Sequence, residues 1–79
     1  MKIFQERLRL ARKAKGITQE EAAKQLSISL RTYRRYETGE AEPGLFSAVA
    51  IANFYDVSLD YLTGRTSSGI GPGPQSLTP

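Results

Sequence analysis

The 79-residue sequence contains no cysteine and no histidine. Without cysteine it can form neither a disulfide framework nor a cysteine zinc site. Without histidine it lacks the commonest general base and metal ligand. It has no apolar run near the roughly 18 residues that suggest a membrane span, and its charged start, residues 1–7, lacks the apolar core of a signal peptide. We therefore expect no metal, no cofactor and no membrane partner, and a cytoplasmic binding module is favoured over an enzyme.

Charge is unevenly distributed along the chain, although the net charge is only +3. Residues 1–35 hold ten of the eleven Lys and Arg residues and three of the eight acidic residues, which gives this half a net charge of +7. Residues 36–79 carry a net charge of −4. The basic half is a candidate surface for binding a polyanion. The alternative is a solvated surface whose charges happen to be segregated.

The composition changes after Arg65. Residues 66–79 carry no charge and include three glycines and three prolines but only two aliphatic residues. Such a segment cannot bury enough apolar surface to offset the entropy of ordering it, so we expect a disordered tail. The folded domain is then residues 2–65, which is close to the size at which dimerisation helps a domain to fold.

Capping and breaking residues divide the domain into five short helices without strands. The expected helices cover residues 3–15, 19 to 25 or 26, 30–37, 45–55 and 59–62. The second opens on a capping box formed by Thr18 and Glu21. The first, third and fifth expected helices are each followed by a glycine, the residue that commonly ends a helix. On the expected buried faces lie Phe4, Leu8, Ala11, Tyr33, Tyr36, Leu45, Ala48, Ile51, Ala52 and Tyr55.

Two of these helices are joined by only three residues, 27–29, which indicates a helix-turn-helix. Ala23 is small enough to allow the helices to cross closely, and Ile28 can fill the angle between them. The residues that then point outward from the second of the two helices are Leu30, Arg31, Thr32, Arg34 and Arg35.

The stretch TQEEAAKQLSISLRTYRRYETGEAEP, followed by LFSAVAIANFYDVSLDYL, resembles the phage repressor and Cro (XRE-type) helix-turn-helix family. The resemblance covers roughly residues 4–63. It implies an all-α, five-helix bundle of the lambda-repressor-like DNA-binding type. It also implies a sequence-specific regulator that binds double-stranded DNA, with residues 30–37 in the major groove. A repressor is favoured because 79 residues leave no room for an activation domain.

Individual roles follow from the resemblance, position by position. Leu30, Arg31 and Arg35 match positions that reach base edges, and this suits their chemistry, because Arg can bond guanine and Leu can touch a thymine methyl group. Contacts to the phosphate backbone are implied for Gln19, Thr32 and Arg34. An ion pair that holds the domain together is implied for Arg12 and Glu37.

Two positions depart from the family pattern. Ser27 stands where the family usually has glycine, and a positive φ there would cost a serine some free energy. The loop after the third helix is acidic at Glu40 and Glu42, where basic residues often face the DNA. Acidic side chains at that point would repel phosphate and weaken non-specific binding.

Phe46, Ala50 and Phe54 recur every four residues on the fourth helix, beside its expected buried face. With Tyr61 nearby, such an exposed apolar stripe predicts a dimer interface; the alternative is a larger core. A two-fold dimer would set two recognition helices about 34–36 Å apart and would read a palindromic operator.

Other interpretations of the same residues are weaker. Glu20 with Glu21, or Glu40 with Glu42, can be interpreted as paired catalytic carboxylates, but capping and an exposed loop explain them more simply. Tyr33 and Tyr36 can be interpreted as a stacking platform for single-stranded bases, although their spacing favours the core. A different class of function also stays open, namely an antitoxin or a protein-interaction adaptor with a protein partner.

Overall fold

The computed structural model describes residues 2–66 of the chain. In that range the chain folds into five helices and no strand, which confirms the expected all-α order. The helices are α1 (Lys2–Lys15), α2 (Gln19–Gln25), α3 (Leu30–Thr38), α4 (Leu45–Tyr55) and α5 (Leu59–Thr63). In the part of the chain described, none of them is long and apolar enough to cross a membrane. From residue 67 onward, the tail that we expected to be disordered lies outside the described residues.

Local sequence signals place the helix ends. At the start of α2 the capping box is complete: the backbone N–H of Glu21 donates to Oγ1 of Thr18 at 3.0 Å, and the N–H of Thr18 donates to Oε1 of Glu21 at 2.8 Å. Ser29 caps α3 by accepting a hydrogen bond from the N–H of Thr32. Gly39 ends α3 in the left-handed conformation, with φ of 85°, where a side chain would be strained.

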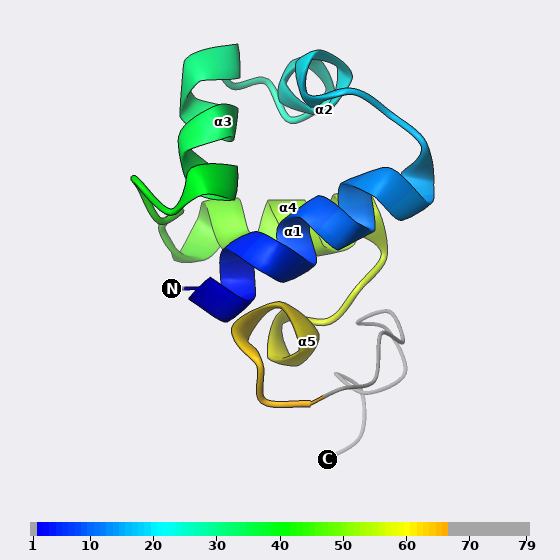
Figure 1. The fold of residues 1–79 in the computed structure, drawn as a ribbon, viewed down its shortest axis with the longest axis vertical. Coiled ribbons are helices and arrows are strands. Elements are labelled where there is room, and N and C mark those ends of the chain that lie inside the picture. The colour runs from blue at the N-terminus through cyan, green and yellow to red at the C-terminus, as the bar shows by residue number, and fades with distance from the viewer. Residues whose placement is uncertain (1, 67–79) are drawn as a thin grey trace.

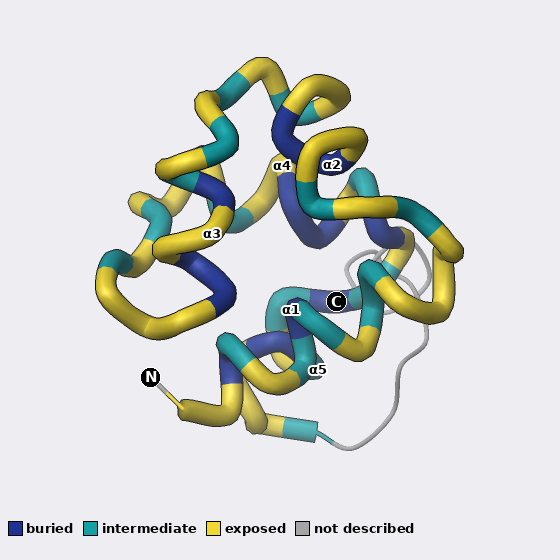
Figure 2. Tube along the Cα trace, turned by 45° about the horizontal axis from the view of Figure 1, so that its top comes forward, coloured by how far each residue is buried: buried dark blue, intermediate teal, exposed yellow. Residues whose placement is uncertain are grey.

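The helices surround one core (Figure 1). α1 lies across α4 and also contacts α3 and α5, while α2 packs mainly against α3. The buried parts of the helices turn toward the middle of the molecule, and the loops and outer faces are exposed (Figure 2). The core consists of Phe4, Leu8, Ala22, Ala23, Tyr33, Tyr36, Ile51, Ala52, Tyr55 and Leu62. Most of the expected core residues are therefore confirmed.

Ala11 and Ala48 are only half-buried, and Leu45 is the clear exception, because 70% of its surface is exposed. Its spacing from Ala48 and Ala52 predicted a core position, and that prediction is wrong. The reason lies in where α4 meets the rest of the domain. Full burial on α4 begins only at Ile51, so the first turns of the helix extend past the core. Periodicity identifies the side of a helix that faces inward but not how far along the helix the core reaches.

The apolar stripe on α4 is divided between surface and core. Phe46 is 88% exposed and Ala50 is also exposed. Phe54, by contrast, packs partly against the core, and Nζ of Lys15 lies 4.9 Å from its ring centroid. Tyr61 is also half-buried, with the guanidinium of Arg7 4.5 Å from its ring centroid.

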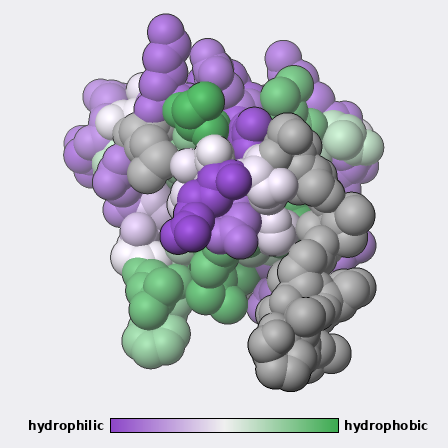
Figure 3. Space-filling model, turned by 90° about the horizontal axis from the view of Figure 1, so that it is seen from below, coloured by the Kyte–Doolittle hydropathy of each residue, from purple (hydrophilic) through white to green (hydrophobic). Residues whose placement is uncertain are grey.

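An exposed apolar surface remains on the first turns of α4. Its large residues are Leu45, Phe46 and Val49, the last of which is 37% exposed. We call these three residues the α4 patch. Seen from below, apolar side chains gather along the lower edge of the molecule (Figure 3). Apolar area exposed in this way is typical of an interaction surface.

Candidate nucleic-acid interface

The outer face of α3 carries the basic residues singled out from the sequence. Tyr33 and Tyr36 point into the core, with exposed fractions of 0% and 9%. Since neighbouring helix positions are about 100° apart, burial of these tyrosines turns the arginines between and beside them outward. Arg31, Arg34 and Arg35 are all exposed. Leu30 and Thr32, also expected to face outward, are half-buried.

The turn between α2 and α3 sets how α3 is presented. Ala23 is 97% buried where the two helices approach, and Ile28 packs against the core as expected. The N–H of Ile28 donates to the carbonyl of Ala23 at 3.0 Å, which closes the turn. Ser27 has a φ of 59°, so the positive φ that we considered for this departure from glycine is present.

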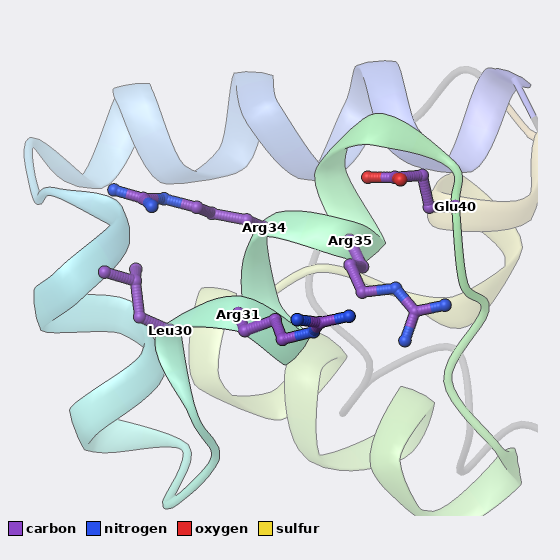
Figure 4. Close-up of a pocket in the computed structure, with 5 residues that line it drawn as sticks. All are labelled: Leu30, Arg31, Arg34, Arg35 and Glu40. Carbon is purple, nitrogen blue, oxygen red and sulfur yellow. The ribbon is translucent and has the colours of Figure 1, made fainter.

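A shallow hollow on this surface is lined by Leu30, Arg31, Arg34, Arg35 and Glu40. The three arginines do not point the same way (Figure 4). Arg34 extends toward α2, whereas Arg31 and Arg35 extend toward the loop after α3. The surface therefore presents one guanidinium on its α2 side and two on its loop side. In residues 2–66, no cluster of acidic side chains could hold a metal ion.

Among the described residues, Glu40 is the one acidic residue that lines the hollow. Its Oε1 accepts a hydrogen bond from Oγ1 of Thr38 at 3.0 Å, and its own N–H lies 3.4 Å from the same hydroxyl. Thr38 thus holds the Glu40 carboxylate at the end of α3. A negative charge in this place opposes the field of the arginines.

A buried polar cluster supports the surface from behind. Glu37 on α3 is 1% exposed, and Arg12 on α1 donates to it from Nε to Oε2 at 2.7 Å and from Nη2 to Oε1 at 3.3 Å. The ion pair expected between these residues is therefore present. Gln19, at the start of α2, donates from Nε2 to Oε1 of the same carboxylate at 3.0 Å. Glu37 thus joins the first three helices.

Burial and hydrogen bonding shift the pKa of the Glu37 carboxyl in opposite directions. Burial disfavours its charged form, but hydrogen bonds from Arg12, Tyr33 and Gln19 outweigh this effect, so the pKa of the carboxyl is lowered. Burial is also the main reason why the pKa of Tyr33 is raised far above its ordinary value. The hydroxyls of Tyr33 and Tyr55 lie 2.6 Å apart in the core. At neutral pH the cluster therefore holds one ionised carboxylate between neutral tyrosines and a charged arginine.

Some of these contacts had no sequence signal. Gln19 was expected to face DNA, yet its amide is bound to Glu37 and its carbonyl oxygen accepts from Nε of Arg34 at 3.4 Å. Arg9 was not singled out, but its Nη1 donates to the backbone carbonyl of Glu37 at 2.6 Å. The pairing of Tyr33 with Tyr55 joins positions 22 residues apart, and only their shared apolar pattern hinted at proximity.

Together, the five helices, the tight turn and the outward basic face of α3 define a helix-turn-helix protein. The family model described as helix-turn-helix matches residues 8–62. The chain belongs to this family, which confirms the resemblance to the phage repressor and Cro type.

Three curated relatives illustrate the range of the family. The chain is 43% identical over 60 residues to the uncharacterized HTH-type transcriptional regulator YqaE of Bacillus subtilis, covering 76% of this chain and 52% of YqaE. It is 45% identical over 65 residues to the cryptic phage CTXphi transcriptional repressor RstR of Vibrio cholerae, covering 82% and 57%. It is 36% identical over 59 residues to the HTH-type transcriptional activator BcrR of Enterococcus faecalis, covering 75% and 29%.

The chain spans little more than half the length of the first two relatives. No solved structure matches the chain significantly.

Proposed function

We propose that this chain is a sequence-specific transcriptional regulator that binds double-stranded DNA. The observation that carries the proposal is the geometry of α3, where Tyr33 and Tyr36 are buried and three arginines stand on the opposite, exposed face. A basic helix presented by a tight turn fits the major groove, which admits an α-helix. The matched relatives named as transcriptional regulators support the same proposal.

The two sides of the hollow suggest a division of roles. Arg31 and Arg35 point to the loop side, lie four residues apart and are the side chains that would bond guanine O6 and N7. Leu30 would contact a thymine methyl group. Gln19, Thr32 and Arg34 would contact the phosphate backbone and set the register of α3. No residue is assigned a catalytic role.

Two copies of the chain would pair through the α4 patch. An aromatic side chain that is 88% exposed, Phe46, is costly to leave in water, and it adjoins the exposed Leu45 and Val49. Ala50 belongs to the same exposed side, whereas Phe54 and Tyr61 contribute only the parts that the core leaves accessible. A two-fold dimer predicts an inverted-repeat operator with half-sites about one DNA turn apart.

Repression by occupying an operator is the simplest mode of action in the cytoplasm. The name of RstR supports it, since that relative is a phage repressor. BcrR is named an activator, so relatives named for either sign of regulation match this chain. A reporter gene placed behind the selected operator, with and without the protein, measures that sign directly.

Selection of bound duplexes from a random DNA library at near-physiological salt tests the proposal. Enrichment of an inverted repeat is the expected result. Binding that stays weak, salt-sensitive and independent of sequence would contradict it, and would favour the antitoxin or adaptor alternative.

Sedimentation of the wild type and of Phe46→Asp tests the dimer separately. The substitution should shift the protein to monomer, because a buried carboxylate without a partner opposes association. Leu10→Asp is the matched control, since Leu10 is 58% exposed on α1 and lies outside the α4 patch. An unchanged dimer in Phe46→Asp would rule out this interface.

A further inference from the structure

Gln19 lies between a buried carboxylate and an exposed guanidinium. Its Nε2 is 3.0 Å from Oε1 of Glu37, and its Oε1 is 3.4 Å from Nε of Arg34. Gln19 itself is half-buried, whereas Arg34 is exposed and Glu37 is 99% buried. The three side chains therefore form a path from the interior to the surface that faces α2.

The chemistry of the carboxylate fixes the orientation of the Gln19 amide. An ionised carboxylate can only accept hydrogen bonds, and Arg12 keeps Glu37 in its ionised form through a 2.7 Å ion pair. The nitrogen end of the amide must therefore face Glu37, and the carbonyl end must face away from it. A phosphate oxygen is also only an acceptor, so the carbonyl end cannot bind phosphate; within this side chain only the second N–H of Nε2 has the chemistry to do so. Its suitable partner is a donor, and Arg34 supplies one.

The hydrogen bond from Nε of Arg34 to Oε1 of Gln19 restricts the orientation of the Arg34 side chain. With Nε directed to Gln19, the guanidinium plane is oriented and its two Nη groups are left for another acceptor. Arg34 extends from α3 toward α2, apart from Arg31 and Arg35 (Figure 4). Holding a long side chain in place before binding reduces the entropy that binding would otherwise lose.

We propose that Gln19 is a positioning residue, and that Arg34 is the group through which this part of the surface binds a backbone phosphate. The buried pair Arg12 and Glu37 orients Gln19, and Gln19 orients Arg34. This inference rests on the proposed function, because the phosphate belongs to the DNA. It alters that proposal in one respect: Gln19 acts through Arg34 and not by its own contact with the backbone.

A double-mutant cycle of Gln19→Ala and Arg34→Ala tests the inference. The full chain is titrated with a duplex obtained by the selection above, over a range of salt concentrations. Arg34→Ala should weaken binding about tenfold and should reduce the slope of log K against log salt by about 0.9, the value for one phosphate contact. Gln19→Ala should weaken binding less than Arg34→Ala, and it should have no further effect once Arg34 is absent.

Arg34→Lys separates charge from orientation. Lysine keeps the positive charge but has no group equivalent to Nε, so it cannot pair with Gln19 in the same way. We expect the wild-type salt slope with an affinity close to that of Gln19→Ala. Lys24→Ala is the control, because Lys24 is an exposed basic residue on α2 that does not line the hollow. The loss of binding free energy caused by Lys24→Ala should simply add to the loss caused by Gln19→Ala, with no coupling energy between the two substitutions.

Thermal unfolding of each variant shows whether it is folded, and the salt slope is a readout that a purely structural role would not change. Additive effects in the cycle, with a further loss of affinity for Gln19→Ala in the Arg34→Ala background, would overturn the inference, because Gln19 would then bind the DNA by itself. If the wild type selects no duplex at all, the proposed function fails together with it. If the wild type binds a selected duplex and only the coupling is missing, the proposed function stands and this inference fails.

Discussion

Arg12 donates from Nε to Oε2 of Glu37 across 2.7 Å, and this ion pair joins the second half of α1 to the last turns of α3. Its partners are 15% and 1% exposed. The pair lies directly behind the surface that carries Arg31, Arg34 and Arg35. Through the carbonyl of Glu37, which accepts from Arg9, α1 also contacts the backbone of α3.

Loss of this ion pair should destabilise the folded state strongly. Arg12→Ala leaves a buried carboxylate without its main donor, and we expect a loss of about 3–5 kcal/mol in the free energy of unfolding. Urea unfolding measures the change. Arg65→Ala is the matched control, since it removes the exposed 3.7 Å pair with Asp60 and should cost about 0–1 kcal/mol. Equal effects of the two substitutions would contradict the role assigned to Glu37.

Acid should unfold the protein partly through Glu37. The folded state lowers the pKa of this carboxyl from its ordinary value of 4.5. Its contribution to stability is therefore complete above that value and is lost as the pH falls through the folded pKa. Urea unfolding from pH 6 to pH 3 should show a decline, and Glu37→Gln should flatten it while lowering stability at pH 6. A decline of the same steepness in the variant would show that other groups cause it.

Ser27 adopts a conformation that glycine tolerates better. With φ of 59°, Ser27→Gly should raise the free energy of unfolding by about 0.5–1 kcal/mol, since the left-handed strain is removed. Ser47→Gly, in the exposed part of α4, should have the opposite sign because glycine is a poor helix former. Thermal unfolding of both variants gives the comparison. A destabilised Ser27→Gly would mean that the turn is not strained.

Removing either loop-side arginine should change specificity. Arg31→Ala or Arg35→Ala should cost about 1–3 kcal/mol on the selected site and relax the preference at one base position. Titration against the site and its single-base variants measures both quantities. Arg65→Ala, beyond α5, changes the net charge equally and should leave the base preference unchanged. If neither α3 variant alters binding, the assignment of α3 as the reading helix is wrong.

Neutralising Glu40 should strengthen non-specific binding. Glu40 lines the hollow beside the arginines, so Glu40→Gln removes a charge that repels phosphate. We expect about a two- to fivefold gain in affinity for duplexes of random sequence at low salt, fading as salt screens the charge. Asp60→Asn on α5, also exposed, changes the net charge by the same amount. If both variants gain the same affinity for random duplexes, the effect of Glu40 is only that of net charge.

Much of the fold and of the basic surface could be predicted from local sequence. Thr18 with Glu21, Ser29 and Gly39 specify helix ends through contacts within a few residues, so the chain on either side is enough to identify them. The burial of Tyr33 and Tyr36 follows from helix periodicity, and it fixes which side of α3 carries the arginines. The ion pair of Arg12 with Glu37 came from the family resemblance and not from spacing.

The sequence by itself therefore determined the five helices, their caps and the exposed basic face of α3, because these depend on short-range interactions. Only the tertiary structure decided that Leu45 is exposed, that Phe54 packs against the core and that Gln19 pairs with Glu37 and Arg34. Each of these features depends on the relative position of two helices in the folded domain. That relative position is set by the packing of the whole core, and no local sequence pattern contains it.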